Sequence, residues 1–146
     1  MTATAGSAGV RASGIVGTVT ISGGTVTANG GTVTFSYNWS DTYAITGLAG
    51  KLTMSGGSLT ANGGAIKKSD DYIESSATGT YGIRTSGAVN ITGGTVVAKG
   101  GTLEDGLTAI DGIRAVKAGT FTTGKGVTVR AGSSESDAAV IDDFSI

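Results

Sequence analysis

The chain has 146 residues, of which 27 are glycine and only 5% are aromatic, and its formal net charge is −1. This length fits a single domain with a real but thin core, and the even charge balance excludes the basic surface of a nucleic-acid-binding domain. There is no Cys and no His, which excludes disulfides, thiolate metal sites and the commonest general base. No apolar run is long enough to span a membrane.

The first six residues contain neither the charged region nor the apolar region of a signal peptide. Either the protein acts inside the cell or the sequence is a mature or excised segment of a longer chain. We expect the second, because neither end resembles a dedicated cap.

From residue 17 onward, one glycine-bounded unit recurs along the chain. It reads GTVTISGGTVTANGG at 17–31, GKLTMSGGSLTANGG at 50–64, GAVNITGGTVVAKGG at 87–101 and, in degraded form, GTFTTGKGVTVRAG at 119–132. Apolar and polar residues alternate within each unit, as they do in half-buried strands. Glycine pairs at 23–24, 56–57 and 93–94 suit sharp corners between strands.

Each unit is one part of a longer repeat. A glycine-containing element precedes it, reading GVRASG from residue 9, AITGLAG from 44, GIRTSG from 82 and GIRAVKAG from 112. A further apolar position follows it in the first three repeats, at Val33, Ile66 and Leu103. We therefore expect coils at about residues 9–43, 44–81, 82–109 and 110–132. Residues 133–146 would form a C-terminal tail or partial cap.

The pattern predicts one all-β domain over residues 1–146, a right-handed parallel β-solenoid of about four coils, because recurring coils bury their apolar faces only against their neighbours. Equivalent residues should stack in two columns: Val19, Leu52, Val89 and Phe121, and Val26, Leu59, Val96 and Val127. The competing fold is an antiparallel sheet with a hairpin at residues 23–24, which would pair Ile21 with Val26. Such a sheet needs a second layer, for which large apolar side chains are too few.

The repeat resembles the right-handed β-helix repeats of secreted bacterial surface proteins. It is most similar to the carbohydrate-binding β-helix family of Gram-positive and gut bacteria, over residues 9–132. The clearest stretches are GIRTSGAVNITGGTVVAKGG at 82–101 and AIDGIRA at 109–115. The resemblance implies an extracellular or cell-surface location, attachment within a longer chain, and binding of acidic polysaccharide, in some members with calcium.

The variable loops carry the candidate metal ligands. They leave the coils at one corner and so should lie side by side, with Asp70, Asp71, Glu104 and Asp105 among their carboxylates. Converging carboxylates supply the oxygen ligands that Ca²⁺ prefers. The alternative is a set of solvated charges that keeps the solenoid soluble.

Arginine and aromatic residues are the candidate ligand-binding residues. Arg11, Arg84 and Arg114 occupy one place in the aligned elements, with Thr46 in the second coil, so their guanidinium groups should stack and bind sugar carboxylates. They could equally pair with acidic residues such as Asp111. Three aromatic residues lie in the first loop: Tyr37, Trp39 and Tyr43. Their rings could stack on sugar rings, or they could fold over the coil as a small local core.

These features predict a non-catalytic segment of a secreted or surface-anchored bacterial protein, acting in adhesion or carbohydrate binding. The main alternative is a structural stalk or a fibre subunit that associates end to end, because open solenoid ends expose strand edges. Two weaker alternatives are ice binding, from T-x-T pairs such as Thr25 and Thr27, and a polysaccharide-lyase-like enzyme. We expect no enzymatic activity, because the sequence contains no His, no Cys and no paired-acid motif.

Overall fold

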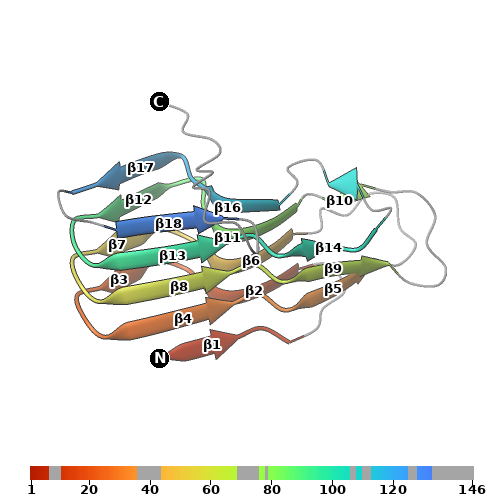
Figure 1. Ribbon diagram of the computed structural model, residues 1–146, viewed down its shortest axis with the longest axis horizontal. Coiled ribbons are helices and arrows are strands. Elements are labelled where there is room, and N and C mark those ends of the chain that lie inside the picture. The colour runs from red at the N-terminus through yellow and green to blue at the C-terminus, as the bar shows by residue number, and fades with distance from the viewer. Residues whose placement is uncertain are drawn as a thin grey trace.

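The computed structural model describes residues 1–6, 11–35, 44–68, 76–77, 79–105, 108–109, 113–124 and 128–132. Within these ranges all the regular elements are β-strands, and all their pairings are parallel. The chain crosses the front of the molecule in one direction, returns across the back and rises by one strand each time, which makes the solenoid right-handed (Figure 1). The predicted right-handed parallel β-solenoid is thus confirmed. The antiparallel alternative is wrong, since Ile21 pairs with Met54 of the next coil.

Each coil passes through the same series of strand positions. The first coil consists of β2 (Arg11–Val16), β3 (Val19–Ile21), β4 (Thr25–Asn29) and β5 (Thr32–Phe35). The second consists of β6 (Ala44–Ala49), β7 (Leu52–Met54), β8 (Ser58–Asn62) and β9 (Ala65–Lys68). The third consists of β11 (Gly79–Arg84), β12 (Ala88–Ile91), β13 (Thr95–Lys99) and β14 (Thr102–Leu103). The fourth consists of β16 (Ile113–Lys117), β17 (Thr120–Thr123) and β18 (Thr128–Gly132).

Equivalent strands build four stacked sheets, which we name after their strand in the first coil. The β2 sheet contains β2, β6, β11 and β16, and the β3 sheet contains β3, β7, β12 and β17. The β4 sheet contains β4, β8, β13 and β18 and is extended at its N-terminal edge by β1 (Thr2–Thr4), while the β5 sheet contains β5, β9 and β14. Two short strands, β10 (Ser76–Ala77) and β15 (Thr108–Ala109), pair with each other.

The apolar columns form the core. Val19, Leu52, Val89 and Phe121 pair in one continuous row across the β3 sheet, as predicted. The second column runs through Val26, Leu59 and Val96 but continues to Val129 instead of Val127. The reason is a longer corner: four residues separate Thr123 from Thr128, whereas three separate the equivalent Ile91 and Thr95. Val127 itself lies outside the described residues.

The glycine pairs make the corners between the β3 and β4 sheets. The second glycine of each pair, Gly24, Gly57 and Gly94, has a φ of 75°, 85° and 94°, respectively. L-amino acids with a side chain rarely adopt this left-handed region. These glycines therefore let three successive coils turn at the same place and keep their strands in register.

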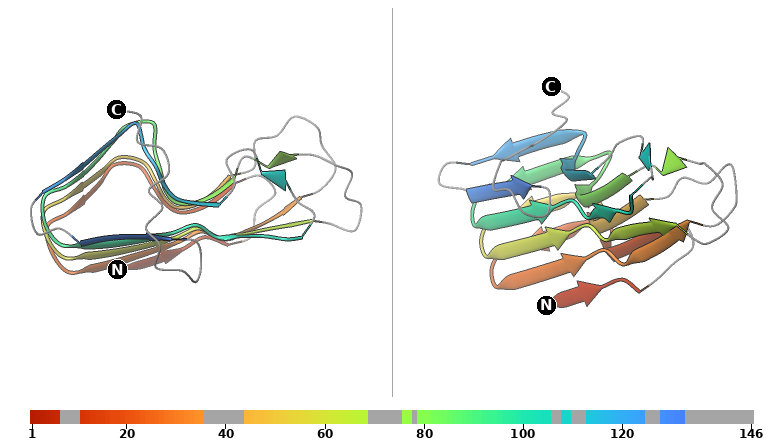
Figure 2. Two further views of the ribbon diagram at one scale, coloured as in Figure 1. Left: turned by 45° about the horizontal axis from the view of Figure 1, so that its top comes forward. Right: turned by 45° about the vertical axis from the view of Figure 1, so that its right-hand side comes forward.

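A column of glycines brings the β2 sheet onto the β4 sheet. A Cβ at Gly14 would lie 2.5 Å from the backbone oxygen of Asn29, and one at Gly47 would lie 2.7 Å from that of Asn62. At Gly82 it would lie 2.7 Å from the backbone nitrogen of Lys99. The cross-section is consequently pinched at its middle, as the left view of Figure 2 shows. We call this narrowing the waist.

The waist separates the main core from a smaller buried region. The main core lies toward the β3 sheet and includes Leu48, Leu52, Met54 and Ile83. The smaller region is lined by residues such as Ile45, Val33 and Ile66, which are also fully buried. Here the buried hydroxyl of Thr80 donates to the backbone oxygen of Gly64 (3.0 Å) and accepts from the N–H of Gly101 (3.1 Å).

Candidate functional site

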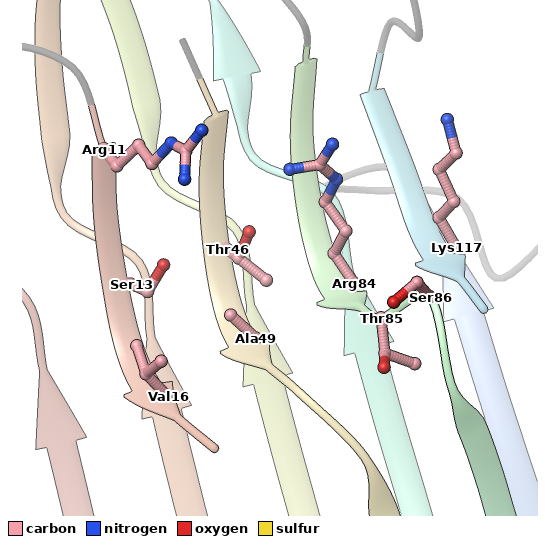
Figure 3. A pocket seen from close by; sticks show the side chains of 9 residues that line it. All are labelled: Arg11, Ser13, Val16, Thr46, Ala49, Arg84, Thr85, Ser86 and Lys117. Atoms are coloured by element: carbon pink, nitrogen blue, oxygen red, sulfur yellow. The ribbon is translucent and has the colours of Figure 1, made fainter. Parts of the chain in front are cut away.

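A groove is lined by side chains of the β2 sheet, the sheet whose backbone bends inward at the waist (Figure 2, left). Its volume is about 580 Å³. The lining side chains come from all four coils and are shown in Figure 3: Arg11, Ser13, Val16, Thr46, Ala49, Arg84, Thr85, Ser86 and Lys117. We call this hollow the basic groove, because its charged members are two arginines and a lysine.

The strand register explains which side chains reach the basic groove. One row of paired residues consists of Ser13, Thr46, Tyr81 and Arg114, and the next consists of Val16, Ala49, Arg84 and Lys117. The waist glycines lie between these rows in the chain. Because a glycine lets the two sheets touch, the outer surface above it is concave instead of flat. The groove thus follows from the absence of side chains beneath it.

The cations of the groove are unevenly spaced along the solenoid. Arg11 begins β2 in the first coil, while Arg84 in β11 pairs directly with Lys117 in β16. Adjacent strands lie about 4.8 Å apart, so Arg84 and Lys117 emerge next to each other from the same face (Figure 3). Among the described residues that line the groove there is no Asp or Glu. Arg84 and Lys117 thus bring two cationic side chains to one end of the groove.

Arg84 is held by an aromatic ring. Its guanidinium carbon lies 5.1 Å from the centroid of Tyr81, within the range of a cation–π interaction. Tyr81 is 0% exposed. Arg84 is one of the residues predicted to bind a ligand, whereas its contact with the Tyr81 ring was not predicted. Residues three apart lie on opposite faces of a regular strand, so the spacing of Tyr81 and Arg84 gave no signal for this pair.

The predicted arginine column does not form. Arg11 pairs with Ala44, Arg84 pairs with Ala49 and Lys117, and Arg114 pairs with Tyr81, so the three arginines occupy three different places in their strands. The prediction aligned Gly82 with Gly9 and Gly112. The waist instead aligns Gly82 with Gly14 and Gly47, each followed by Ile or Leu.

Two of the three arginines nevertheless belong to the groove. Arg11 and Arg84 line it, and Lys117, which was not among the predicted ligand-binding residues, supplies the cation of the fourth coil. Arg114 is half-buried in the row of Tyr81 and is not among the lining residues. The cations of the groove thus come from different positions in their coils. Aligning one position of the repeat therefore does not identify them.

Of the predicted metal ligands, the structure describes Glu104 and Asp105. The Lys68 backbone N–H donates to Glu104 Oε2 at 3.0 Å, and Lys68 Nζ donates to the Asp105 backbone oxygen at 2.7 Å. The described part of the chain holds no group of three or more potential metal-ligating side chains. Asp70 and Asp71 lie outside the described residues, so the calcium site stays a prediction.

The aromatic residues of the first loop, Tyr37, Trp39 and Tyr43, also lie outside the described residues, as does the tail at 133–146. The threonine pairs of the first coil do not form one array, since Thr20, Thr25 and Thr32 belong to three different sheets. Within the β4 sheet the row from Thr27 through Thr60 ends at Val97. The T-x-T array that begins at Thr25 and Thr27 therefore does not continue into the third coil.

Comparison with known proteins supports the repeat. The chain is similar to the family described as "Beta helix repeat", whose model matches residues 19–38, 52–65 and 89–119. These matches begin at Val19, Leu52 and Val89, the first column of the core. No curated protein and no solved structure matches the chain. The β-helix repeat is a general fold element and by itself does not indicate catalysis.

Nowhere in the described ranges is there a helix with the length and apolar character needed to cross a membrane.

Proposed function

We propose that this protein is a non-catalytic β-solenoid segment that binds a polysaccharide in the basic groove, outside the cell or at a bacterial cell surface. The observation that supports this most is the composition of the groove. Four hydroxyl-bearing side chains and three cations line one concave surface. Hydroxyls both donate and accept hydrogen bonds, and cations donate several, which matches a ligand rich in hydroxyl and charged oxygen atoms.

The scaffold favours binding with little reorganisation. Ser13, Thr46, Arg84 and Lys117 all project from strands of the β2 sheet, whose backbones are held by parallel ladders. Sites on strands are positioned more accurately than sites on loops, and a preorganised surface loses less entropy on binding. A long polymer lying along the stack would contact several successive coils.

The first loop would extend this site. Residues 36–43 lead into β6, whose first residue, Ala44, pairs with the groove residue Arg11. We propose that Tyr37, Trp39 and Tyr43 contribute sugar-stacking faces at this end, because aromatic rings offer an apolar face together with a polar edge. We also propose that Asp70 and Asp71 contribute carboxylates or bound calcium to ligand binding.

The test is a glycan array followed by titration calorimetry with the best ligand. The double variant Arg11→Gln, Arg84→Gln should lose at least tenfold in affinity, because each lost charge-assisted hydrogen bond is worth about 1.5–3 kcal/mol. The matched control is Lys99→Gln, which removes one charge from an exposed position on the β4 sheet. Failure of any glycan to bind, or equal loss in the control, would refute the proposal.

A second candidate function is a stalk or fibre that grows end to end. It is supported by the open first coil: Ile15, Val19 and Val26 are only partly buried, whereas their partners in the next coil, Leu48, Leu52 and Leu59, are fully buried. Within the described ranges, β2 and β3 have no partner on their N-terminal side. Sedimentation velocity across a hundredfold range of concentration tests this: assemblies should grow with concentration, and a constant monomer would exclude it.

A further inference from the structure

Two asparagines of the β4 sheet are each followed by glycine. Asn29 ends β4 and Asn62 ends β8, and both lie in the sequence TANGG, at residues 27–31 and 60–64. In a flexible peptide, asparagine before glycine loses its side-chain ammonia readily, because glycine places no side chain near the reacting atoms. Since the two sequences are identical, any difference in reactivity between the two asparagines comes from the fold.

The reaction is a cyclisation followed by hydrolysis. The backbone nitrogen of the glycine attacks the asparagine Cγ and forms a new bond, while the bond between Cγ and Nδ2 breaks. The proton of the glycine N–H leaves with the side-chain nitrogen as ammonia, and a five-membered succinimide ring remains. Water then opens the ring at either carbonyl, which gives aspartate or isoaspartate. The reaction is slow while the glycine N–H is hydrogen-bonded and the peptide cannot turn toward Cγ.

The ladder of the β4 sheet occupies both glycine N–H groups. The Gly30 N–H donates to the backbone oxygen of Asn62, and the Gly63 N–H donates to that of Lys99, each at 2.8 Å. The two side chains are also linked to each other, since Asn62 Nδ2 donates to Asn29 Oδ1 at 2.8 Å. Cyclisation at either site therefore requires the coil that holds it to separate from the next coil.

The waist holds the same two peptides in place. A Cβ on Gly14 would lie 2.5 Å from the backbone oxygen of Asn29, and one on Gly47 would lie 2.7 Å from that of Asn62. The peptide that must turn for cyclisation includes this carbonyl group. It is therefore held by β2 at Asn29 and by β6 at Asn62, and it turns only when the waist opens locally.

The two asparagines differ in what covers them. The strand that holds Asn62, β6, pairs with β2 on one side and with β11 on the other. Among the strands that the structure describes, β2 pairs with β6 alone. The N-terminal neighbour of Asn29 is β1, a strand of three residues at the edge of the sheet (Figure 1). Edge segments with few buried contacts open more readily than internal ones, so Asn29 should be released first.

The contacts between β1 and Asn29 are few. Asn29 Nδ2 donates to Thr4 Oγ1 at 3.2 Å, and the Ala5 N–H donates to the backbone oxygen of Asn29 at 3.0 Å. The side chains of Thr2 and Thr4 are exposed, so β1 adds little buried surface to these hydrogen bonds. Loss of β1 would remove both of these contacts from Asn29 and leave those of Asn62 unchanged.

We infer that Asn29 is a site of spontaneous deamidation that reacts through local opening of the first coil, whereas Asn62, in the same sequence, is protected by the coils on both of its sides. This inference goes beyond the proposed function and does not depend on it, since neither asparagine lines the basic groove.

Peptide mapping by mass spectrometry tests the order of the two sites. The protein is kept at neutral pH and physiological temperature, both folded and in concentrated urea, and the replacement of amide by carboxyl is followed in each peptide. In urea the two sites should react at equal rates. In the folded protein Asn29 should react about tenfold faster than Asn62 or more, because global unfolding exposes both sites and local opening exposes only one.

Three results of this experiment would overturn the inference. Equal rates at the two sites in the folded protein would show that both react through global unfolding. A faster reaction at Asn62 would place the readily opened coil elsewhere. Absence of product at Asn29 after about a hundred half-lives of the unfolded chain would show that the first coil does not open.

A variant of the N-terminal segment tests the route. Ala5→Pro removes the N–H that donates to the Asn29 backbone oxygen. It should raise the rate at Asn29 severalfold and leave the rate at Asn62 unchanged. The matched control, Ala5→Ser, keeps the N–H and should change neither rate. An unchanged rate at Asn29 in Ala5→Pro, or an equal rise at both asparagines, would refute opening of the first coil as the route.

The two products should differ in their effect on the first coil. The carboxylate of aspartate still accepts the hydrogen bond from Asn62 Nδ2, whereas isoaspartate adds a carbon atom to the main chain and displaces Gly30 from its acceptor. Asn29→Asp, which reproduces the first product, should keep its urea midpoint close to that of the unmodified protein. The isoaspartate form, separated from aged protein by chromatography, should unfold at a lower urea concentration. Equal midpoints would show that the first coil tolerates the longer backbone and would refute this effect.

Discussion

Gly47 in β6 lies against Asn62 in β8 so closely that a Cβ on Gly47 would be 2.7 Å from both the backbone nitrogen and the backbone oxygen of Asn62. This contact between the β2 and β4 sheets produces the waist, and the waist makes the outer surface of the β2 sheet concave. The shape of the basic groove therefore depends on a residue that no ligand in the groove would touch.

Replacing Gly47 should affect both stability and binding. Gly47→Ala forces the sheets apart, because the backbone of Asn62 leaves no room for a methyl group, and overpacking of this kind typically costs about 1–3 kcal/mol. Urea unfolding measures the free-energy change. The control is Gly23→Ala, where nothing lies within 4 Å of the added Cβ and φ is not in the left-handed region. Equal stability of the two variants would contradict the close contact.

The corners offer a separate test of backbone strain. Gly24 has a φ of 75° and nothing within 4 Å of an added Cβ, so Gly24→Ala should cost only the conformational penalty, about 1–2 kcal/mol. Gly57 has a φ of 85°, and its Cβ would also lie 2.5 Å from the backbone oxygen of Gly24. Gly57→Ala should therefore destabilise the protein more, as measured by thermal and urea unfolding. The opposite order would show that the corner relaxes differently.

The hydroxyl of Thr80 should contribute more to the free energy of unfolding than its methyl group does. Thr80→Val removes the acceptor for the Gly101 N–H in a fully buried place, and a buried donor without a partner costs about 1–3 kcal/mol. Thr80→Ser keeps the hydroxyl and should retain most of the stability. Urea midpoints of the two variants decide the matter. If Thr80→Ser is the less stable one, packing dominates over the hydrogen bond.

Calcium binding by the acidic loops is testable by thermal melting. A cation bound by Asp70, Asp71, Glu104 and Asp105 would stabilise the folded state by mass action, so millimolar Ca²⁺ should raise the melting temperature by several degrees. The double variant Asp70→Asn, Asp71→Asn should abolish that increase. Identical melts with Ca²⁺ and with EDTA would instead assign these carboxylates to solvated loops and to contacts such as the one between Glu104 and Lys68.

The sequence alone determined the solenoid, the first core column and the glycine corners, because alternation and glycine pairs are local signals that recur in every coil. Val19, Leu52 and Val89 stack as their spacing predicts. The tertiary structure decided which cations share a surface. Arg84 joins Lys117 and Arg11 because Gly14, Gly47 and Gly82 meet the β4 sheet, a contact between segments that are distant in the chain. The register of the β2 sheet is therefore set by packing between sheets. The sequence pattern of a single strand does not predict such packing.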